Sequence, residues 1–332
     1  MPDSIRWGLL STARINRSLI AGVRASRRSR LVAVASREQS KAQEFAQKWD
    51  IPAAIGSYEA MLADPQIDVI YNPLPNHLHA EWTIKALEAK KHVLVEKPIA
   101  LSVSDVHAIA DAARKNNRVA AEAFMYRHHP QTLKVQEMVG AGELGEVRFI
   151  QGTFSFVLDR PNDIRWNPDF GGGSIWDIGC YPLSYTRMIT GRLPIAVHGF
   201  QVLAPSGVDL TFSGSLQYSD DVLAQFHSSF GLPYNTFMEI QGTKGSLMIS
   251  SPFKPESANV SMHLKREDGQ KEYRFPPREL YLGEVEDIEN AVLDGKKTRL
   301  SLGESAENIA LITALLASAQ TRQAVLISTG AL

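Results

Sequence analysis

Toward the end of its first third, the chain reads His92-Val93-Leu94-Val95-Glu96-Lys97-Pro98. The apolar run is typical of a buried parallel strand, and the strand ends on an ionisable pair. Open α/β sheets bind ligands at the carboxyl ends of their strands. The stretch therefore predicts a glutamate and a lysine at a ligand-binding edge, followed by a turn that Pro98 fixes and in which its peptide bond can be cis. The alternative is a surface turn that carries a solvated ion pair.

The pattern of strand and then helix repeats through residues 5–122. Apolar runs predict the strands, and apolar residues at helical spacing predict the helices. The predicted strands cover 5–10, 31–35, 68–71, 92–95 and 118–122, and the predicted helices cover 14–25, 41–49, 78–89 and 103–115. This alternation indicates right-handed βαβ units and an α/β fold with a parallel, doubly wound sheet. The strand carboxyl ends then bring residues 11–14, 36–37, 72–76 and 96–98 to one edge.

The turn after the first strand is where a dinucleotide-binding chain carries the pattern G-x-G-x-x-G. This chain has Ser11, Ala13 and Asn16 at the three glycine positions. The turn is nevertheless built from small residues, and free amides at a helix start bind pyrophosphate. The alternative is an ordinary turn in which Ser11 or Thr12 caps the helix. We predict phosphate contacts from Ser11, Thr12, Ala13, Arg14 and Ile15.

The end of the second predicted strand reads Ser36-Arg37, where an NAD enzyme has an acid for the ribose 2′-hydroxyl. Arginine pairs with a 2′-phosphate and stacks on adenine, so Ser36, Arg37 and the nearby Lys41 favour NADP over NAD. Glu38 could still accept a 2′-hydroxyl, which leaves NAD possible. In the alternative interpretation Arg37 simply faces water.

A stiff loop with two prolines and two histidines follows the strand that ends at residue 71. It suits a wall against the cofactor's ribose and nicotinamide. His77 and His79 have no third ligand at a recognisable spacing, so we predict no metal and treat His77 as a surface residue. The residues predicted to line the cofactor are Asn72, Pro73, Leu74, Asn76 and His79.

Strict alternation of apolar and polar residues replaces the βα pattern in the second half. Runs such as 208–218 and 222–230 predict half-buried antiparallel strands, 237–249 reads as a hairpin, and 147–156 is another strand. Helices must cover one face of such a sheet, and the other face suits self-association as a homodimer or homotetramer. The predicted domains are 1–123, which binds NADP, and 124–332, which binds substrate and oligomerises.

A helix predicted over 174–190 begins after three glycines and ends at Gly191. Asp177 and Tyr181 share a face of it, and a carboxylate beside a phenol can hold sugar hydroxyls and move a proton. The alternative is a capping box formed by Ser174 and Asp177, with Tyr181 as a core residue. Cys180 has no adjacent basic partner and is interpreted as a buried residue.

Composition narrows the class of protein. The 332 residues are 44% hydrophobic, and 35 basic side chains nearly balance 36 acidic ones. A near-neutral chain without an extended basic run does not predict a nucleic-acid partner. One cysteine excludes an internal disulfide, and no apolar stretch reads as a signal or a membrane span. We therefore expect no membrane association and a cytoplasmic protein.

Four motifs occur together in this chain: 93–98, the Pro73-Leu74-Pro75-Asn76-His77-x-His79 loop, the helix start at 171–181 and Gly242-Thr243-Lys244-Gly245-Ser246. In this order they resemble the glucose-fructose oxidoreductase, inositol dehydrogenase and rhizopine-catabolism (Gfo/Idh/MocA) family. The resemblance covers nearly the whole chain. It implies an N-terminal Rossmann domain, a C-terminal α+β domain with a large open, mostly antiparallel sheet, and a tightly held nicotinamide cofactor.

The resemblance also implies roles for individual residues. Lys97 would be the catalytic lysine at the substrate oxygen, Asp177 a substrate-binding residue that assists catalysis, and Tyr181 the acid/base. Glu96 and Lys97 would lie on the cofactor side. Two further segments match stretches that line the cleft in the family, although both could equally be packing residues: Arg165 and Trp166 toward the cofactor, Met125 and Arg127 toward the substrate.

Many family members have histidine where this chain has Tyr181. Tyrosine there is similar to the branch of glucose-fructose oxidoreductase, NADP-dependent D-xylose dehydrogenases and dimeric dihydrodiol dehydrogenases. The expected reaction is hydride transfer between NADP and a sugar or related polyol, with an aldose such as D-xylose or D-glucose favoured. A keto-sugar reductase and a trans-dihydrodiol dehydrogenase are the alternatives within enzymes, and a non-catalytic dinucleotide-binding sensor is the alternative of another class.

Overall fold

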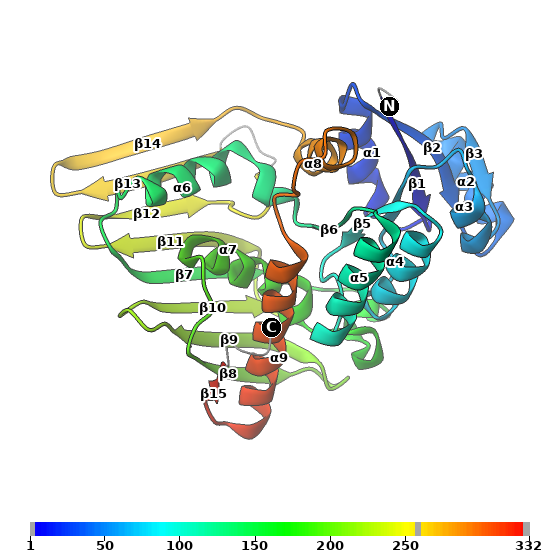
Figure 1. Ribbon diagram of the computed structural model, residues 1–332. Coiled ribbons are helices and arrows are strands. Elements are labelled where there is room, and N and C mark those ends of the chain that lie inside the picture. The colour runs from blue at the N-terminus through cyan, green and yellow to red at the C-terminus, as the bar shows by residue number, and fades with distance from the viewer. Residues whose placement is uncertain (1–3, 256–259, 328–332) are drawn as a thin grey trace. The chain divides into compact units, whose positions relative to one another are not determined.

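The computed structural model describes residues 4–255 and 260–327, which form two compact units, each with its own sheet (Figure 1). The first unit is the chain up to His128 together with Glu279–Ala306, and the second is His129–Arg278 with the chain from Glu307 onward. The sequence predicts a single division after residue 123. The structure instead returns the segment 279–306 to the first unit, so the predicted second domain is interrupted.

The first unit is built from six strands, each followed by helical structure. The strands are β1 (Ile5–Leu10), β2 (Ser29–Ala35), β3 (Ala53–Ile55), β4 (Val69–Asn72), β5 (His92–Glu96) and β6 (Ala120–Ala123). The α-helices are α1 (Asn16–Ala25), α2 (Gln39–Trp49), α3 (Tyr58–Ala63), α4 (His79–Glu88), α5 (Val103–Asn116) and α8 (Leu282–Leu293). Short 3₁₀ turns are η1 (Asn76–Leu78) and η2 (Met125–His128). The short elements β3 and α3 were not predicted from the sequence.

The sheet of the first unit has the order β3-β2-β1-β4-β5-β6, and every neighbouring pair is parallel. This order confirms the predicted doubly wound sheet. From β1 the chain first adds strands on one side, β2 and β3, and then on the other side, starting with β4, and such sheets bind dinucleotides at this switch point. Strand residues including Trp7, Leu9 and Val93 are fully buried because helices cover both faces.

The segment Glu279–Ala306, which belongs to the first unit, packs against α1 through α8. A Cβ on Gly22 of α1 would lie 2.8 Å from the carbonyl carbon of Tyr281, so this close approach requires glycine. Buried Glu289 of α8 accepts hydrogen bonds from the hydroxyls of Ser26 and Ser29, at the start of β2. The helix α8 is therefore an integral part of the first unit.

The second unit is built on a long sheet. Its strands are β7 (Val147–Ser155), β8 (Ala196–Leu203), β9 (Asp209–Gln217), β10 (Leu223–Ser229), β11 (Asn235–Gly242), β12 (Gly245–Ser250), β13 (Val260–Arg266), β14 (Gly269–Phe275) and β15 (Val325–Leu326). Its helical elements are α6 (Pro130–Gly140), the 3₁₀ turns η3 (Ile164–Trp166) and η4 (Pro168–Phe170), the π-helical turn η5 (Ile175–Gly179), α7 (Cys180–Thr190) and most of α9 (Leu302–Thr321).

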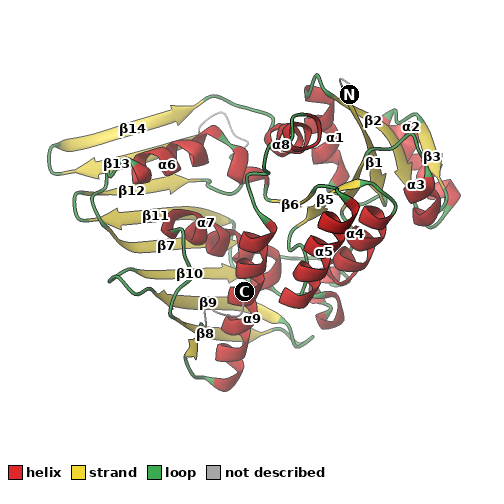
Figure 2. Cartoon of the chain, in the orientation of Figure 1, coloured by secondary structure: helices red, strands yellow, loops and turns green. Residues whose placement is uncertain are grey.

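The order of this sheet is β14-β13-β12-β11-β7-β10-β9-β8-β15, antiparallel throughout except for the pair of β7 and β10. It confirms the predicted large, mostly antiparallel sheet. The helices α6 and α7 lie over one face (Figure 2). Along β9 and β10 buried side chains alternate with exposed ones, as the sequence pattern predicts for a sheet covered on one face.

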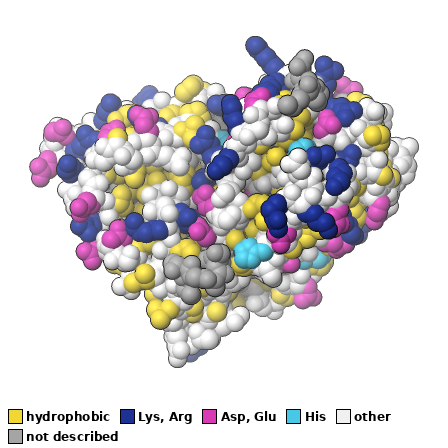
Figure 3. Space-filling view, in the orientation of Figure 1, with side chains coloured by type: hydrophobic (Ala, Val, Ile, Leu, Met, Phe, Trp, Pro, Cys, Tyr) yellow, Lys and Arg dark blue, Asp and Glu magenta, His cyan; other side chains and the backbone are white. Residues whose placement is uncertain are grey.

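The surface is mixed in charge. On the face drawn in Figure 3, Lys and Arg side chains are interspersed with Asp and Glu side chains. Within 4–255 and 260–327, no helix has both the length and the apolar character that crossing a bilayer requires.

Candidate active site

The turn after β5 presents Lys97 at the carboxyl end of the first sheet. The Lys97–Pro98 peptide bond is cis, and the lysine side chain is partly exposed whereas Pro98 is buried. The neighbouring Glu96 carboxylate accepts a hydrogen bond from the hydroxyl of buried Tyr71 on β4. The structure thus places the predicted lysine at the ligand-binding edge and ties Glu96 to the adjacent strand.

The loop between β4 and α4 is held by buried side-chain amide and imidazole groups. The Asn72 amide donates to the His79 carbonyl and to Thr83 Oγ1, both at 3.1 Å, and its Oδ1 accepts from the Leu74 amide. The His79 ring is 1% exposed, with Nε2 2.6 Å from the Leu74 carbonyl and Nδ1 2.7 Å from that of Pro98. Burial lowers the pKa of His79 to about 4, so the ring is neutral near pH 7 and donates to only one of these carbonyls.

Through these contacts, Asn72 and His79 hold the conformation of the loop. Pro73 and Leu74 are buried as well, whereas Asn76, at the start of η1, is partly exposed. Of the five residues predicted to line the cofactor here, Asn76 is the one whose side chain the structure leaves partly accessible, while the others shape the loop.

The turn after β1 has the backbone shape of a glycine turn without the glycines. Ser11 has φ = 106°, a region that favours glycine, and its amide donates to the Ala35 carbonyl. Asn16, at the third glycine position, is fully buried and donates its amide to the Ser11 carbonyl at 2.7 Å. Residues 11–13 and 15 are partly exposed and Arg14 is exposed, beside the first turn of α1. Although Ser11, Ala13 and Asn16 stand in place of the three glycines, the turn keeps the backbone conformation that the predicted phosphate contacts need.

Replacing Ser11 with glycine should stabilise the first unit. A non-glycine residue in a sparsely populated backbone region costs roughly 1–3 kcal/mol, and part of this gain is offset by losing the Ser11 hydroxyl, which accepts from the Ala13 amide. We expect Ser11→Gly to raise the free energy of unfolding in urea by about 1 kcal/mol. Ser18→Gly, inside α1, is the matched control and should lower it by about 0.5–1 kcal/mol. An unchanged or lower stability for Ser11→Gly would contradict the strained turn.

The end of β2 carries the residues predicted to select NADP. Ser36 is buried, and its hydroxyl accepts a hydrogen bond from the Glu38 amide. Arg37 is exposed and lies close to the Tyr58 hydroxyl. Burial raises the pKa of the Tyr58 phenol, and the Arg37 guanidinium offsets part of this rise. The Lys41 ammonium pairs with the Glu38 carboxylate at 2.6 Å. Arg37 and Lys41 are thus both exposed near the end of β2, and Lys41 is paired with Glu38.

Met125 and Arg127 are buried in the first unit. The Arg127 guanidinium forms an ion pair with Glu304 at 2.7 Å, and its side chain is 4% exposed. This pair joins η2 to the start of α9. The structure gives Arg127 a packing role, so direct contact with substrate stays a prediction.

In the second unit, Asp177 meets Arg165. The guanidinium donates from Nε to Asp177 Oδ2 at 2.6 Å and from Nη1 to Asp163 at 3.1 Å, and these carboxylates hold the pKa of Arg165 above its usual range. Neighbouring Trp166 donates its indole N–H to the Arg160 carbonyl and packs edge-on against Phe230. Two residues predicted for different ligands therefore form one partly buried ion pair.

The helix that carries Asp177 and Tyr181 opens with a π-helical turn. Residues 175–179 form η5 and α7 follows at Cys180, so the predicted helix is present but irregular where Asp177 lies. Such turns are frequent at functional sites. Gly191 ends α7 with φ = 67°, as expected.

Asp209 on β9 anchors the start of this helix. Its Oδ2 accepts from Ser174 Oγ at 2.6 Å and from the Ile175 amide at 2.8 Å. A Cβ on Gly173 would lie 2.1 Å from Asp209 Oδ1, which explains a glycine there. Ser174 is itself helical and makes no capping bond, so the capping box with Asp177 is not formed. Burial raises the pKa of Asp209 to about 6.

Tyr181 lies among aromatic side chains. Its ring is 5.4 Å from that of Phe154 and 5.5 Å from that of Phe253, between ring centroids, and the residue is 4% exposed. Cys180 is buried and donates its thiol to the Asp177 carbonyl at 3.5 Å. These ring contacts hold the Tyr181 side chain in the core of the second unit, and its acid/base role stays a prediction.

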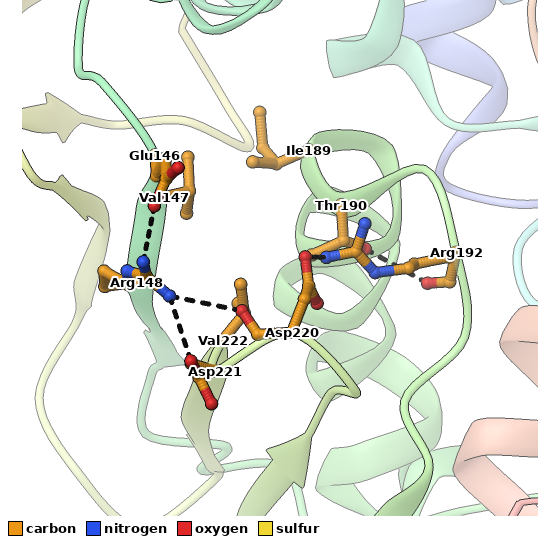
Figure 4. Close-up of a pocket in the computed structure, with 9 residues that line it drawn as sticks. All are labelled: Glu146, Val147, Arg148, Ile189, Thr190, Arg192, Asp220, Asp221 and Val222. Carbon is orange, nitrogen blue, oxygen red and sulfur yellow. Dashed lines mark hydrogen bonds and ion pairs between the residues drawn. The ribbon is translucent and has the colours of Figure 1, made fainter.

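A hollow of about 500 Å³ in the second unit lies apart from these residues (Figure 4). It is bounded by the start of β7, the end of α7 and the turn before β10, and its arginines Arg148 and Arg192 form ion pairs with Glu146, Asp220 and Asp221. None of the predicted site residues lines it. Within the part of the chain that the structure describes, no group of three or more His, Cys, Asp or Glu side chains could hold a metal ion.

Comparison with known proteins agrees with this geometry. Residues 5–124 match a family model described as an oxidoreductase family with an NAD-binding Rossmann fold, and residues 132–248 match the GFO/IDH/MocA C-terminal domain. The parallel sheet of the first unit and the two family matches together define the class of protein as a dinucleotide-dependent oxidoreductase. The chain belongs to the Gfo/Idh/MocA family, which confirms the resemblance and the prediction of a nicotinamide cofactor.

Relatives indicate the chemistry within the family. The chain is 38% identical to an NADP-dependent D-xylose 1-dehydrogenase of Haloferax volcanii, over 96% of this chain and 98% of the relative. It is 35% identical to a trans-1,2-dihydrobenzene-1,2-diol dehydrogenase of Xenopus laevis, over 74% and 75%. A 3-ketoreductase from Actinomadura kijaniata, solved with NADP and TDP-benzene, superimposes with a TM-score of 0.89 at 28% identity and covers 95% of this chain and 98% of its own.

Proposed function

We propose that this enzyme transfers a hydride between NADP and a neutral sugar or related polyol, with an aldose such as D-xylose or D-glucose as the favoured substrate. The observation that carries the proposal is Lys97, partly exposed at the carboxyl edge of a dinucleotide-binding sheet. Solved variants of the Actinomadura 3-ketoreductase have one lysine and one tyrosine substituted, at the same separation along the chain as Lys97 and Tyr181.

The residues of the first unit fit a dinucleotide. The turn at Ser11 has the backbone conformation of a glycine turn and leads into α1, whose first amides suit pyrophosphate. The exposed guanidinium of Arg37 at the end of β2 suits the 2′-phosphate of NADP. Relatives named as NADP-dependent, or solved with NADP, support the same choice.

Removing the Arg37 guanidinium should weaken NADP selectively. We expect Arg37→Leu to raise KM for NADP by about tenfold to a hundredfold, since a charged hydrogen-bonding contact contributes roughly 1.5–3 kcal/mol, while KM for NAD changes by less than about twofold. Lys48→Leu is the matched control, because it removes a positive charge at an exposed position in the last turn of α2 that is not predicted to contact the cofactor. Steady-state kinetics with both cofactors measures the effect. An equal loss with NAD and NADP would contradict 2′-phosphate recognition by Arg37.

Bound NADP supplies the hydride acceptor for substrate oxidation and, as NADPH, the donor for reduction. The chain itself has to orient the substrate and move the hydroxyl proton. We assign the proton to Lys97 and Tyr181 at the substrate oxygen and the binding of a neighbouring hydroxyl to Asp177, whose orientation Arg165 fixes.

Two further reactions are open to the same residues. Relatives are named dTDP-3,4-didehydro-2,6-dideoxy-alpha-D-glucose 3-reductase and trans-1,2-dihydrobenzene-1,2-diol dehydrogenase. Keto-sugar reduction or dihydrodiol oxidation would use the same lysine and tyrosine. The 38% identity to a D-xylose dehydrogenase over nearly the whole chain favours an aldose. Initial rates with aldoses, inositols, dihydrodiols and nucleotide-linked keto-sugars would rank these substrates.

Self-association through the open sheet is part of the proposal. The uncovered side of β8 and β10 exposes large apolar side chains, among them Phe200, Val202 and Leu223. Such surfaces mark interfaces in soluble proteins, which supports a homodimer or a homotetramer. The cytoplasmic location, and the absence of nucleic-acid and membrane partners, stay predictions.

A further inference from the structure

One peptide unit, between Pro98 and Ile99, is held from both sides by buried side chains. Its carbonyl oxygen lies 2.7 Å from His79 Nδ1, and its amide donates to Glu122 Oε1 at 3.0 Å. Both side chains are almost fully buried. Because this peptide unit begins one residue after Lys97, the hydrogen bond from its amide to Glu122 fixes the main chain from which the lysine projects, beside the buried His79 ring.

The strand register explains how Glu122 reaches this position. Glu122 of β6 pairs with Val95 of β5, so its carboxylate lies beside the last residues of the strand that ends at Glu96. Its second oxygen, Oε2, is buried, and none of the residues at 4–255 and 260–327 forms a hydrogen bond with it. A buried carboxylate with one oxygen unpaired is costly unless its charge has a partner.

The charged groups around Glu122 identify that partner. The Ser305 hydroxyl and the Ile99 amide stabilise its ionised form, and the Lys97 ammonium, the cation among these groups, adds a smaller contribution in the same sense. The negative charge of Glu304 on α9 disfavours the ionised form of Glu122. Glu304 itself forms an ion pair with Arg127. Burial outweighs these groups and raises the pKa of Glu122 to about 7.

We infer that Glu122 is a positioning residue for Lys97: its carboxylate holds the Ile99 amide and provides the counter-charge of the Lys97 ammonium, and protonation of Glu122 removes that charge without breaking the hydrogen bond. Above pH 7 the ionised Glu122 stabilises the Lys97 ammonium, and below pH 7 this support is lost. The inference rests on the proposed role of Lys97 for its link to catalysis, although the coupling of the two groups is independent of that role.

Two substitutions separate geometry from charge. Glu122→Gln keeps an oxygen that can accept from the Ile99 amide but removes the negative charge. Glu122→Ala removes both and leaves the amide buried without an acceptor. The matched control is Glu88→Gln, which makes the same chemical change at an exposed position of α4.

The coupling is measured by ¹³C NMR of the reductively methylated protein, with the Lys97 signal identified by its loss in Lys97→Met. In wild type and in Glu88→Gln, we expect this signal to show an inflection near pH 7, where Glu122 titrates. In Glu122→Gln the inflection should disappear, and Lys97 should titrate at lower pH. An unchanged inflection in Glu122→Gln would overturn the inference, whatever the activity of the enzyme.

Kinetics then tests the consequence. We expect kcat of wild type to show an ionisation near pH 7 that Glu122→Gln lacks, with kcat about tenfold lower above pH 7, as for one pKa unit of altered interaction. The Kd for NADP should change by less than about twofold. Glu122→Ala should lose at least a further factor of about ten. An unaltered pH profile in Glu122→Gln would contradict the positioning role, whereas full activity of Lys97→Met would refute the proposed function and leave the NMR result standing.

Discussion

We expect Lys97→Met to lower kcat by at least about a thousandfold and to leave the Kd for NADP within about fivefold of wild type. Methionine retains most of the aliphatic stem but removes the ammonium that the proposal places at the substrate oxygen. General acid–base groups contribute about 10²–10⁴ in rate, and Lys97 also stabilises charge on that oxygen. Steady-state kinetics and fluorescence titration with NADPH measure the two quantities.

The matched control is Lys90→Met. Lys90 lies in the same unit, is exposed, and donates to the Asn116 side chain at the far end of β5. It should retain at least half of the wild-type activity. More than about a tenth of the activity remaining in Lys97→Met, with normal NADP binding, would exclude Lys97 as the principal catalytic group.

Tyr181→Phe is expected to lower kcat by about 10²–10⁴ while the protein stays folded. The substitution removes only the hydroxyl, and the ring keeps its contacts with Phe154 and Phe253. The loss should be smallest at high pH, where water or hydroxide partly replaces the missing base. Rates across pH 6–10, with circular dichroism to verify the fold, test this expectation.

Tyr185→Phe provides the comparison, because Tyr185 is buried one turn later on α7 and also packs on Phe253. It should change kcat by less than about threefold. If Tyr181→Phe kept full turnover while Lys97→Met had none, the acid/base assignment of Tyr181 would fail and Lys97 alone would have to carry the proton.

The sequence predicts the fold well where periodicity is strong. The strand 5–10 and the end of the helix at Thr190 appear where the apolar pattern and Gly191 place them. The short elements β3 and α3 were missed because three and six residues are too few to show a period. The return of α8 to the first unit depends on a close contact between Gly22 and Tyr281, residues far apart in the chain, which no local pattern encodes.

The candidate site was predicted as a set of residues, not as a set of contacts. Motif spacing finds Lys97, Asp177 and Tyr181, but the pairing of Arg165 with Asp177 arises from the fold of the second unit. Glu122 was overlooked because a single acid at the end of an apolar strand carries no local signal. Asp209 was overlooked for the same reason, since its partners Ser174 and Ile175 lie on another element.

The most direct test follows the hydride itself. The enzyme is incubated with NADP and with the aldose that gives the highest rate, carrying deuterium at its anomeric carbon, and the NADPH formed is analysed by mass spectrometry. The proposed reaction predicts deuterium on the nicotinamide, at an initial rate that Lys97→Met abolishes. Tight NADP binding without NADPH formation from any sugar or diol, and without NADPH oxidation by any keto-sugar, would contradict it and favour a dinucleotide-binding sensor.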